Sequence, residues 1–288
     1  MNLVEFNKLD KETALKELFS CCGSSKWVSL LMNHFPFISE QDLIDKAATI
    51  WYDECNSDDW QESFAHHPKI GDKKSLEQKF AGKEQAGIAA ASSDTINALA
   101  KANADYENKF ARPDAAVGRG FIFIVCATGK SAEEMLRLLQ DRLQNDKEDE
   151  LNIAMGEQHK ITIIRLKKLL AAADWQWMKP SQITTHVLDT SVGIPGKGIT
   201  IRLKSASNKT IAQSVTNADG RIGDLLPSEK SLRPGNYKMV FDTGNYFKAN
   251  KTKGFYPEIE IQFTVSDNSH YHVPLLINPF GYSTYRGN

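Results

Sequence analysis

The chain closes with His270-Tyr-His-Val-Pro-Leu-Leu-Ile-Asn-Pro-Phe-Gly-Tyr-Ser-Thr-Tyr-Arg-Gly-Asn288, a strand pattern followed by a polar tail. Because strand side chains alternate between two faces, the two histidines are expected on one face and the intervening apolar residues on the other. The pattern fits one wall of a site that presents imidazoles. It equally fits an edge strand with surface histidines and a solvated tail.

The same period of two continues upstream of this stretch. It appears in Ile199-Thr-Ile-Arg-Leu-Lys204, Tyr237-Lys-Met-Val-Phe241 and Ile259-Glu-Ile-Gln-Phe-Thr-Val265. Turn signals such as Ala218-Asp-Gly220 and Arg233-Pro-Gly-Asn236 separate these runs. Short alternating strands joined by such turns predict a β-sandwich over residues 183–288.

The first part of the chain has helical apolar spacing instead. The helical segments are Lys11–Phe19, Glu40–Asn56, Thr95–Phe110, Ser131–Leu143 and Ile153–Leu170. Ser39 is expected to cap the second segment, and Arg165, Lys167 and Lys168 are expected to form a basic last turn of the final one. Phe121–Cys126 is an exception, since its length suits either a short buried strand or part of a helix.

These patterns predict a multidomain α and β protein. An all-α helical domain spans residues 1–172, a linker with Trp175, Trp177 and Pro180 spans 173–182, and the β-sandwich spans 183–288. A length of 288 residues suits two domains better than one.

The composition limits the classes of partner. With 41% hydrophobic residues, 25% charged residues and a net charge of -1, the chain gives no electrostatic case for nucleic acid or an anionic membrane. No apolar run approaches the roughly 20 residues of a membrane span. The 4 cysteines lack metal-ligand spacing and are interpreted as reduced thiols. The start lacks a signal-peptide pattern and the end lacks a peroxisomal address, so we expect a cytoplasmic protein.

Three polar motifs carry the chemistry of the β half: Thr185-His-Val-Leu-Asp189, Thr216-Asn-Ala-Asp-Gly-Arg221 and the C-terminal strand with its tail. Together they resemble the 5-hydroxyisourate hydrolases, the enzymatic branch of the transthyretin family, over about residues 183–288. The resemblance implies that His186, Arg221 and His272 are catalytic. It also implies that the tail lines the substrate site through Tyr285, Arg286 and Gly287. The last residue departs from the family, with Asn288 in place of serine.

Hydrolysis of a cyclic ureide needs an activated water and stabilised charge on the carbonyl oxygen. Either His186 or His272 can be the base, and Arg221 can keep an imidazole neutral and hold a planar ring. Two alternatives remain: a zinc site built from three histidines, and a transthyretin-like carrier without activity. The resemblance also implies a homotetramer with sites at subunit interfaces.

The helical half carries a second set of motifs: Cys21-Cys-Gly-Ser-Ser-Lys-Trp27, Asp59-Trp60, His67-Pro-Lys-Ile-Gly71, Glu84-Gln85 and Gly120-Phe-Ile-Phe-Ile-Val-Cys-Ala127. They resemble OHCU decarboxylase, which acts on 2-oxo-4-hydroxy-4-carboxy-5-ureidoimidazoline, over about residues 3–170. The resemblance implies catalytic roles for His67 and Glu84. The implied substrate contacts are Pro68, Gln85, Phe123, Ile124, Val125, Cys126 and Ala127. His66 lies outside the pattern and is interpreted as structural.

Two features depart from this second family. Ala81 stands where the family usually has serine, and residues 111–119 form an insert before the expected pocket floor. The reaction itself needs no cofactor, because the ring delocalises the charge that carbon dioxide leaves behind. The protein must supply a proton from one face, which His67 can do near neutral pH, and groups that hold the ring.

The order of the two halves is similar to that of the bifunctional allantoin synthases. We therefore expect urate catabolism in two steps, hydrolysis of 5-hydroxyisourate in the β domain and decarboxylation of OHCU to (S)-allantoin in the helical domain, with no metal and no cofactor. The alternative is a ligand-binding or scaffold protein in which one or both sites are inactive.

Overall fold

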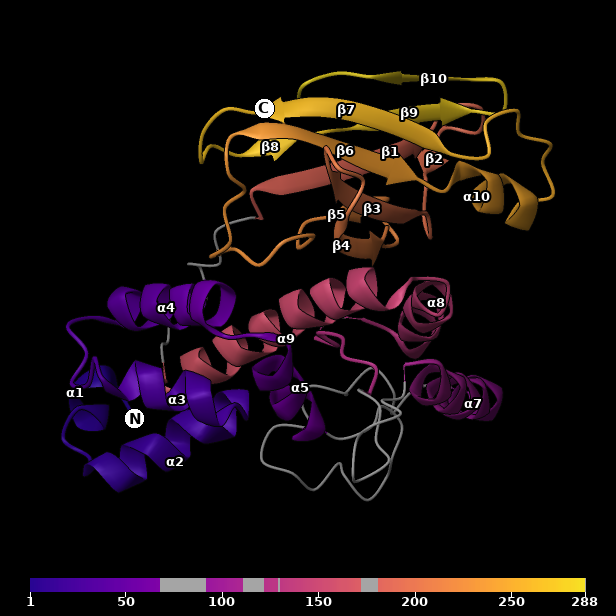
Figure 1. Cartoon of the computed structure of the whole chain (residues 1–288). Coiled ribbons are helices and arrows are strands. Elements are labelled where there is room, and N and C mark those ends of the chain that lie inside the picture. The colour runs from indigo at the N-terminus through magenta and orange to yellow at the C-terminus, as the bar shows by residue number, and fades with distance from the viewer. Residues whose placement is uncertain (68–91, 111–121, 129, 172–180, 288) are drawn as a thin grey trace. The chain divides into compact units, whose positions relative to one another are not determined.

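A computed structural model describes the chain over residues 1–67, 92–110, 122–128, 130–171 and 181–287 (Figure 1). The chain divides into two compact units, Met1–Leu143 with Ala154–Trp177 and Gln144–Ile153 with Met178–Asn288. The described strands all follow residue 181, whereas the described residues before 172 that form regular structure are helical. The predicted fold class is thereby confirmed. The predicted linker lies almost entirely outside the described residues, and the domain bounds at 172 and 183 stay a prediction.

The described helices before residue 172 follow the apolar periodicity. They are α1 (Leu3–Phe6), α2 (Lys11–Cys22), α3 (Ser25–Met32), α4 (Glu40–Thr49), the π-helical turn η1 (Ile50–Glu54), α5 (Ser57–Ala65), α7 (Ser93–Lys109), α8 (Ala132–Arg142) and α9 (Lys147–Leu169). Ser39 caps α4 as predicted, because its Oγ accepts the Asp42 N–H at 3.1 Å. The predicted segment Glu40–Asn56 is thus an α-helix continued by a π-helical turn, in which the hydrogen bonds reach one residue further.

Buried aromatic and aliphatic side chains form the core of the helical unit, among them Phe6, Leu18, Trp27, Leu43, Trp51 and Phe64. Each such side chain contributes about 1.5–3 kcal/mol when it is buried. The indole N–H groups are satisfied inside this core. Trp27 donates to the Ala47 carbonyl at 2.9 Å and Trp51 to the Met155 carbonyl at 3.1 Å.

Two predictions about the helical part were wrong. Residues 122–127 form neither a strand nor a helix and are instead a buried irregular segment. Of the three basic residues predicted for the last turn of α9, Lys167 and Lys168 lie there and Arg165 does not. Arg165 is buried, at 7% exposure. Helical period alone does not show which charged side chains face a core.

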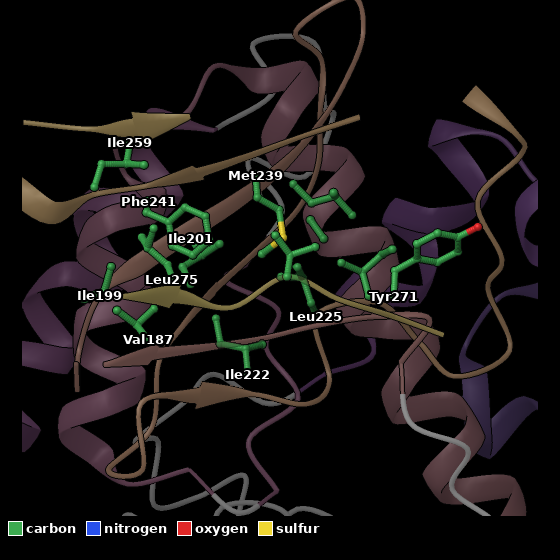
Figure 2. Close-up of a cluster of buried hydrophobic side chains, with 14 of the residues drawn as sticks. Val187, Ile199, Ile201, Ile222, Leu225, Met239, Phe241, Ile259, Tyr271 and Leu275 are labelled. Carbon is green, nitrogen blue, oxygen red and sulfur yellow. The ribbon is translucent and has the colours of Figure 1, made fainter. Parts of the chain in front are cut away.

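The second unit is a sandwich of two sheets. Its strands are β1 (Ile183–Asp189), β2 (Ile194–Pro195), β3 (Thr200–Ser205), β4 (Thr210–Val215), β5 (Arg221–Ile222), β6 (Gly235–Phe241), β7 (Ile259–Val265), β8 (Tyr271–His272), β9 (Leu275–Asn278) and β10 (Gly281–Thr284). One sheet has the order β10-β9-β1-β2, with β5 and β8 also paired to β1, and the other has the order β4-β3-β6-β7. Apolar side chains of the two sheets, such as Val187, Leu275, Ile201 and Phe241, point into one shared layer (Figure 2).

One element of this unit escaped the sequence patterns. Helix α10 (Thr243–Ala249) follows β6, and the Asp242 side chain caps it by accepting the Asn245 N–H at 3.1 Å. Its seven residues are too few to show a helical period. No helix in the described part of the chain is long and apolar enough to cross a membrane.

Candidate functional site

Strand β1 places the polar groups of the β unit on one face of its sheet. In the β1–β5 ladder His186 lies opposite Arg221, and in the β1–β8 ladder Thr184 lies opposite His272. Opposed residues of neighbouring strands project to the same face, as do residues two apart on one strand. The structure therefore brings together His186, Arg221 and His272, from three strands, with Thr184 between the two histidines.

The opposite face of these strands is core. Ile183, Thr185 and Val187 alternate with Thr184 and His186 and are buried, and so are Tyr271 and Val273 on either side of His272. The predicted alternation along the C-terminal strand is thus confirmed. The imidazoles lie on the face that points away from the sandwich interior, where a ligand can reach them.

Burial and positive charge keep both of these histidines neutral. Burial lowers the pKa of His186, the Arg221 guanidinium lowers it further, and Asp219 partly opposes the shift. The pKa of His272 is also lowered, by burial first and then by Arg221, His270 and His186. A neutral imidazole can accept a proton, so the arrangement can activate a water molecule near neutral pH.

The tail returns to the same strand. The Gly287 N–H donates to the His272 carbonyl at 3.0 Å. A Cβ atom at position 287 would lie 2.5 Å from Cδ2 of His272, so only glycine lets the tail pass the imidazole ring. Arg286 lies elsewhere, with its guanidinium carbon 5.4 Å from the centre of the Tyr271 ring, and Tyr285 is 60% exposed. That these two side chains line a substrate site stays a prediction.

His67 follows helix α5, which ends at Ala65. Its N–H donates to the Phe64 carbonyl at 3.1 Å. The neighbouring His66 packs on Phe19, with ring centroids 5.0 Å apart, and on Gly23, where a Cβ would lie 2.9 Å from His66 Cβ. His66 is therefore a packing residue, as interpreted from the sequence.

The ring of His67 has its Nε2 atom on the inner side of the unit. Its Nε2 atom is enclosed and has no hydrogen-bond partner among the described residues. The pKa of His67 is lowered to about 3, first by burial, then by Arg165 and His66, while Gln158 opposes the shift. His67 is hence a neutral imidazole at neutral pH, with an enclosed ring nitrogen that a ligand could satisfy.

Two neighbours of His67 on α9, Gln158 and Arg165, were missed by the sequence analysis. They lie seven positions apart on α9, which places them on the same helix face. Both are buried, and Gln158 donates from Nε2 to the Cys22 carbonyl at 3.3 Å. The sequence signal that could have found them is the polar run Glu157-Gln-His-Lys160 within α9, a helix without a clear division into a polar and an apolar face.

The irregular segment 122–127 is held by two buried charges. The Arg142 guanidinium donates to the Ile124 carbonyl at 2.7 Å, and its carbon lies 4.6 Å from the centre of the Phe123 ring. Glu157 accepts the Cys126 N–H at 2.7 Å and pairs with Lys160 at 2.6 Å. These bonds give partners to the Ile124 carbonyl and the Cys126 N–H, which lie outside the described helices and strands. The five residues predicted as the pocket floor, Phe123 to Ala127, are all buried in it.

Part of the predicted helical site cannot be placed. Glu84, Pro68 and Gln85 lie outside the described residues, as do Ala81 and the insert at 111–119. Their roles stay predictions. His67 and the segment Phe123–Ala127 are the predicted site residues of this unit that the structure describes.

The other reactive groups in the described part of the chain are side chains that could bind metal and the cysteine thiols. Among these residues, no group of three or more His, Cys, Asp or Glu side chains is placed to hold a metal ion. The four cysteines are buried thiols. Burial raises the pKa of Cys22 and of Cys55 to about 12, so neither is a thiolate at neutral pH.

Comparison with known proteins divides the chain in the same way. The OHCU decarboxylase family model matches residues 7–167, and the HIUase/Transthyretin family model matches residues 183–287. The Arabidopsis thaliana uric acid degradation bifunctional protein TTL is 33% identical over 326 residues, covering 93% of this chain and 96% of that protein. The Mus musculus 5-hydroxyisourate hydrolase is 43% identical over 115 residues, covering 38% of this chain and 96% of that protein. The 5-hydroxyisourate hydrolase of Salmonella dublin is also 43% identical, over 37% of this chain and 80% of that protein.

Proposed function

Because the chain belongs to the OHCU decarboxylase family over residues 7–167 and to the HIUase/transthyretin family over residues 183–287, we propose that it carries out two consecutive steps of urate degradation. It is a bifunctional enzyme, with the hydrolase in the C-terminal part and the decarboxylase in the N-terminal part. 5-Hydroxyisourate is hydrolysed to OHCU, and OHCU is decarboxylated to (S)-allantoin. The observation that carries the first step is the gathering of His186, Arg221 and His272 on one sheet face.

In the hydrolase, a neutral imidazole takes a proton from water as the water attacks the ring carbonyl. We assign His272 as this base because it is more enclosed than a histidine on the protein surface. In addition, its Nδ1 atom is held by Thr184 Oγ1 at 2.9 Å. His186 then faces the ring beside Arg221, whose planar fork of donors suits a flat ureide. The same guanidinium offsets negative charge as it develops on the carbonyl oxygen.

In the decarboxylase, His67 must hold a proton when the carbanion forms. Its lowered pKa makes it neutral in the empty site. A substrate carboxylate placed near its ring offsets the repulsion from Arg165 and raises the pKa of His67 again. The imidazole is therefore charged only in the presence of the substrate, and it delivers its proton to one face of the ring. Glu84 and Gln85 are proposed to hold the ureide N–H groups.

The protein is further proposed to be a homotetramer that assembles through the β unit. Strand β10 lies at the end of its sheet, and Phe280, Tyr282 and Tyr285 near it expose large aromatic surfaces. An edge strand with exposed aromatic side chains is suited to pairing with a second copy. Light scattering after size-exclusion chromatography tests this, with a monomer at micromolar concentration as the contrary result.

A cytoplasmic location is proposed as well, since four buried thiols suit a reducing compartment. No observation favours the carrier alternative. A transthyretin-like carrier does not need two neutral imidazoles beside a guanidinium.

The function is tested by generating 5-hydroxyisourate from urate and urate oxidase with and without this protein. Ultraviolet absorbance follows both intermediates, and circular dichroism follows the chirality of the product. We expect both intermediates to disappear faster than they decay unaided, and the allantoin to be optically active. Unchanged decay rates with a racemic product would contradict both activities.

A further inference from the structure

Thr184 joins two histidines through one hydroxyl group. Its Oγ1 lies 2.9 Å from Nδ1 of His272 and 2.8 Å from Nε2 of His270. The two imidazoles are two residues apart and nearly parallel, at 22° with centroids 6.4 Å apart, because they share a strand face. The register that sets Thr184 opposite His272 fixes this arrangement in the backbone. His272 is the base of the proposed hydrolysis, so a catalytic role for Thr184 and His270 rests on that proposed function.

The hydroxyl has one proton and two neighbours, which limits the tautomers. When Thr184 donates to Nδ1 of His272, its oxygen accepts from Nε2–H of His270. When it donates to His270, its oxygen accepts from Nδ1–H of His272. Only the second arrangement leaves Nε2 of His272 with a lone pair that can take a proton from water. When Nε2 of His272 takes a proton, a concerted shift through the hydroxyl passes its Nδ1 proton on toward His270, and loss of the Nδ1 proton of His270 completes the change from the second arrangement to the first.

The surroundings of His272 disfavour a lasting positive charge. Arg221 from β5, His186 from β1 and His270 from its own segment all lie near it, and burial together with these groups lowers the pKa of His272. Asp219 faces His186 rather than His272. His270, by contrast, is exposed, so water can solvate a charge on its ring.

We propose that His272, Thr184 and His270 form a proton relay that keeps His272 neutral during hydrolysis. Nε2 of His272 takes a proton from the attacking water, the water oxygen bonds to the ring carbonyl carbon, and the carbonyl π pair moves to the carbonyl oxygen. At the same time the Nδ1 proton of His272 passes to Thr184 Oγ1, and the hydroxyl proton of Thr184 passes to Nε2 of His270. His270 becomes an imidazolium and releases its Nδ1 proton to solvent. When the carbonyl re-forms, the ring C–N bond breaks and the leaving nitrogen takes the Nε2 proton of His272, while solvent returns a proton to His270 and the relay runs back to its starting state. His270 and Thr184 are then positioning and relay groups, and the ring carbonyl meets only His272, His186 and Arg221.

The test compares three variants of the full chain in steady-state hydrolysis of 5-hydroxyisourate. Thr184→Val keeps the shape of the side chain and removes the hydroxyl; Thr184→Ser keeps the hydroxyl. Thr185→Val is the matched control, because Thr185 is the adjacent residue and its hydroxyl donates to the Val273 carbonyl on the core side, at 2.7 Å. Thermal unfolding of each variant checks that the fold is retained.

For Thr184→Val we expect kcat to fall by about 10²-fold with an unchanged KM, the lower end of what positioned proton transfer contributes. Thr184→Ser should recover most of the rate, and Thr185→Val should stay close to the wild type. In mixtures of H₂O and D₂O, kcat of the wild type should fall along a curve, since more than one proton moves. The Thr184→Val protein should give a straight line.

His270→Gln provides a second variant on the exposed side, where folding is not at risk. It should lower kcat to a similar degree and straighten the same plot.

The relay is overturned if Thr184→Val and His270→Gln keep the wild-type kcat and isotope curve while His272→Ala slows the hydrolysis. If the wild type does not accelerate hydrolysis at all, the proposed function fails instead. A rate loss in Thr185→Val equal to that in Thr184→Val would also overturn the relay, because it would assign the loss to packing.

Discussion

The two units hold their histidines in opposite ways. In the β unit, His186 and His272 are half-buried beside Arg221, on a sheet face set by strand register. In the helical unit, His67 is turned inward and its enclosed Nε2 has no partner among the described residues. The first arrangement suits an imidazole that exchanges protons with water. The second suits one whose protonation depends on the ligand that fills the site.

The largest contrast should come from removing each imidazole in turn. His67→Ala should slow the decarboxylation of OHCU by about 10³-fold, since a positioned proton donor contributes about 10²–10⁴-fold. Hydrolysis of 5-hydroxyisourate should stay unchanged. Stopped-flow absorbance with circular dichroism measures both steps at once. Retention of an optically active product by this variant would remove His67 from the mechanism.

The converse change, His272→Ala, should slow the hydrolysis by about 10²-fold, a smaller loss because His186 and Arg221 remain. Decarboxylation of OHCU supplied from another source should be unaffected. His34→Ala, in which an exposed histidine of the helical unit is removed, is the control for both variants. Equal rates in His272→Ala and His34→Ala would contradict the assigned base.

A smaller effect should follow from loosening the buried segment 122–127. Glu157→Gln keeps an acceptor for the Cys126 N–H but loses the ion pair with Lys160. We expect kcat/KM of decarboxylation to fall about tenfold and the unfolding free energy to fall by about 1–3 kcal/mol, because a buried charge-assisted contact is lost. Urea unfolding and steady-state kinetics measure the two quantities.

The control for that change is Glu12→Gln, because Glu12 forms an exposed ion pair with Lys16. Exposed pairs contribute about 0–1 kcal/mol, so its stability and activity should stay near the wild type. If Glu157→Gln behaves like Glu12→Gln, the segment does not depend on Glu157.

The last prediction concerns the pH dependence of stability. The pKa of His67 is lowered from 6.5 to about 3 in the folded protein, so the unfolded chain binds the proton more readily between these values. Stability therefore rises with pH across this window and is lost as the pH falls, by at most about 1.4 kcal/mol per pH unit. His67→Asn should flatten this dependence, measured as the difference in unfolding free energy between the two proteins from pH 7 to 4. An identical slope in both would show that His67 is not enclosed in solution.

The sequence predicted the β site better than the helical one, for a physical reason. Because a strand has a period of two, the sequence alone predicts that His270 and His272 share one face. The buried side chain of Tyr271 between them confirms this alternation. The sequence does not show the strand register, which sets Thr184 opposite His272. That pairing depends on how strands far apart in the chain meet.

In the helical unit the decisive neighbours come from a distant part of the chain. Gln158 and Arg165 reach His67 from α9, a helix that begins only at Lys147. Arg165 was predicted to belong to a basic helix terminus because charge near a C-terminus is common. Its burial beside other polar groups is a property of the packed fold. The conformation of the irregular segment 122–127 could not be predicted from periodicity either, because the side chains of Arg142 and Glu157 hold its backbone.

The central claim is that each unit has its own complete set of catalytic groups for one of two consecutive reactions. It is tested most directly by mixing equal amounts of the His67→Ala and His272→Ala proteins and supplying 5-hydroxyisourate. We predict that the mixture restores fast loss of both intermediates and an optically active allantoin, although neither variant does so alone. A mixture that remains as slow or as racemic as the single variants would contradict the claim.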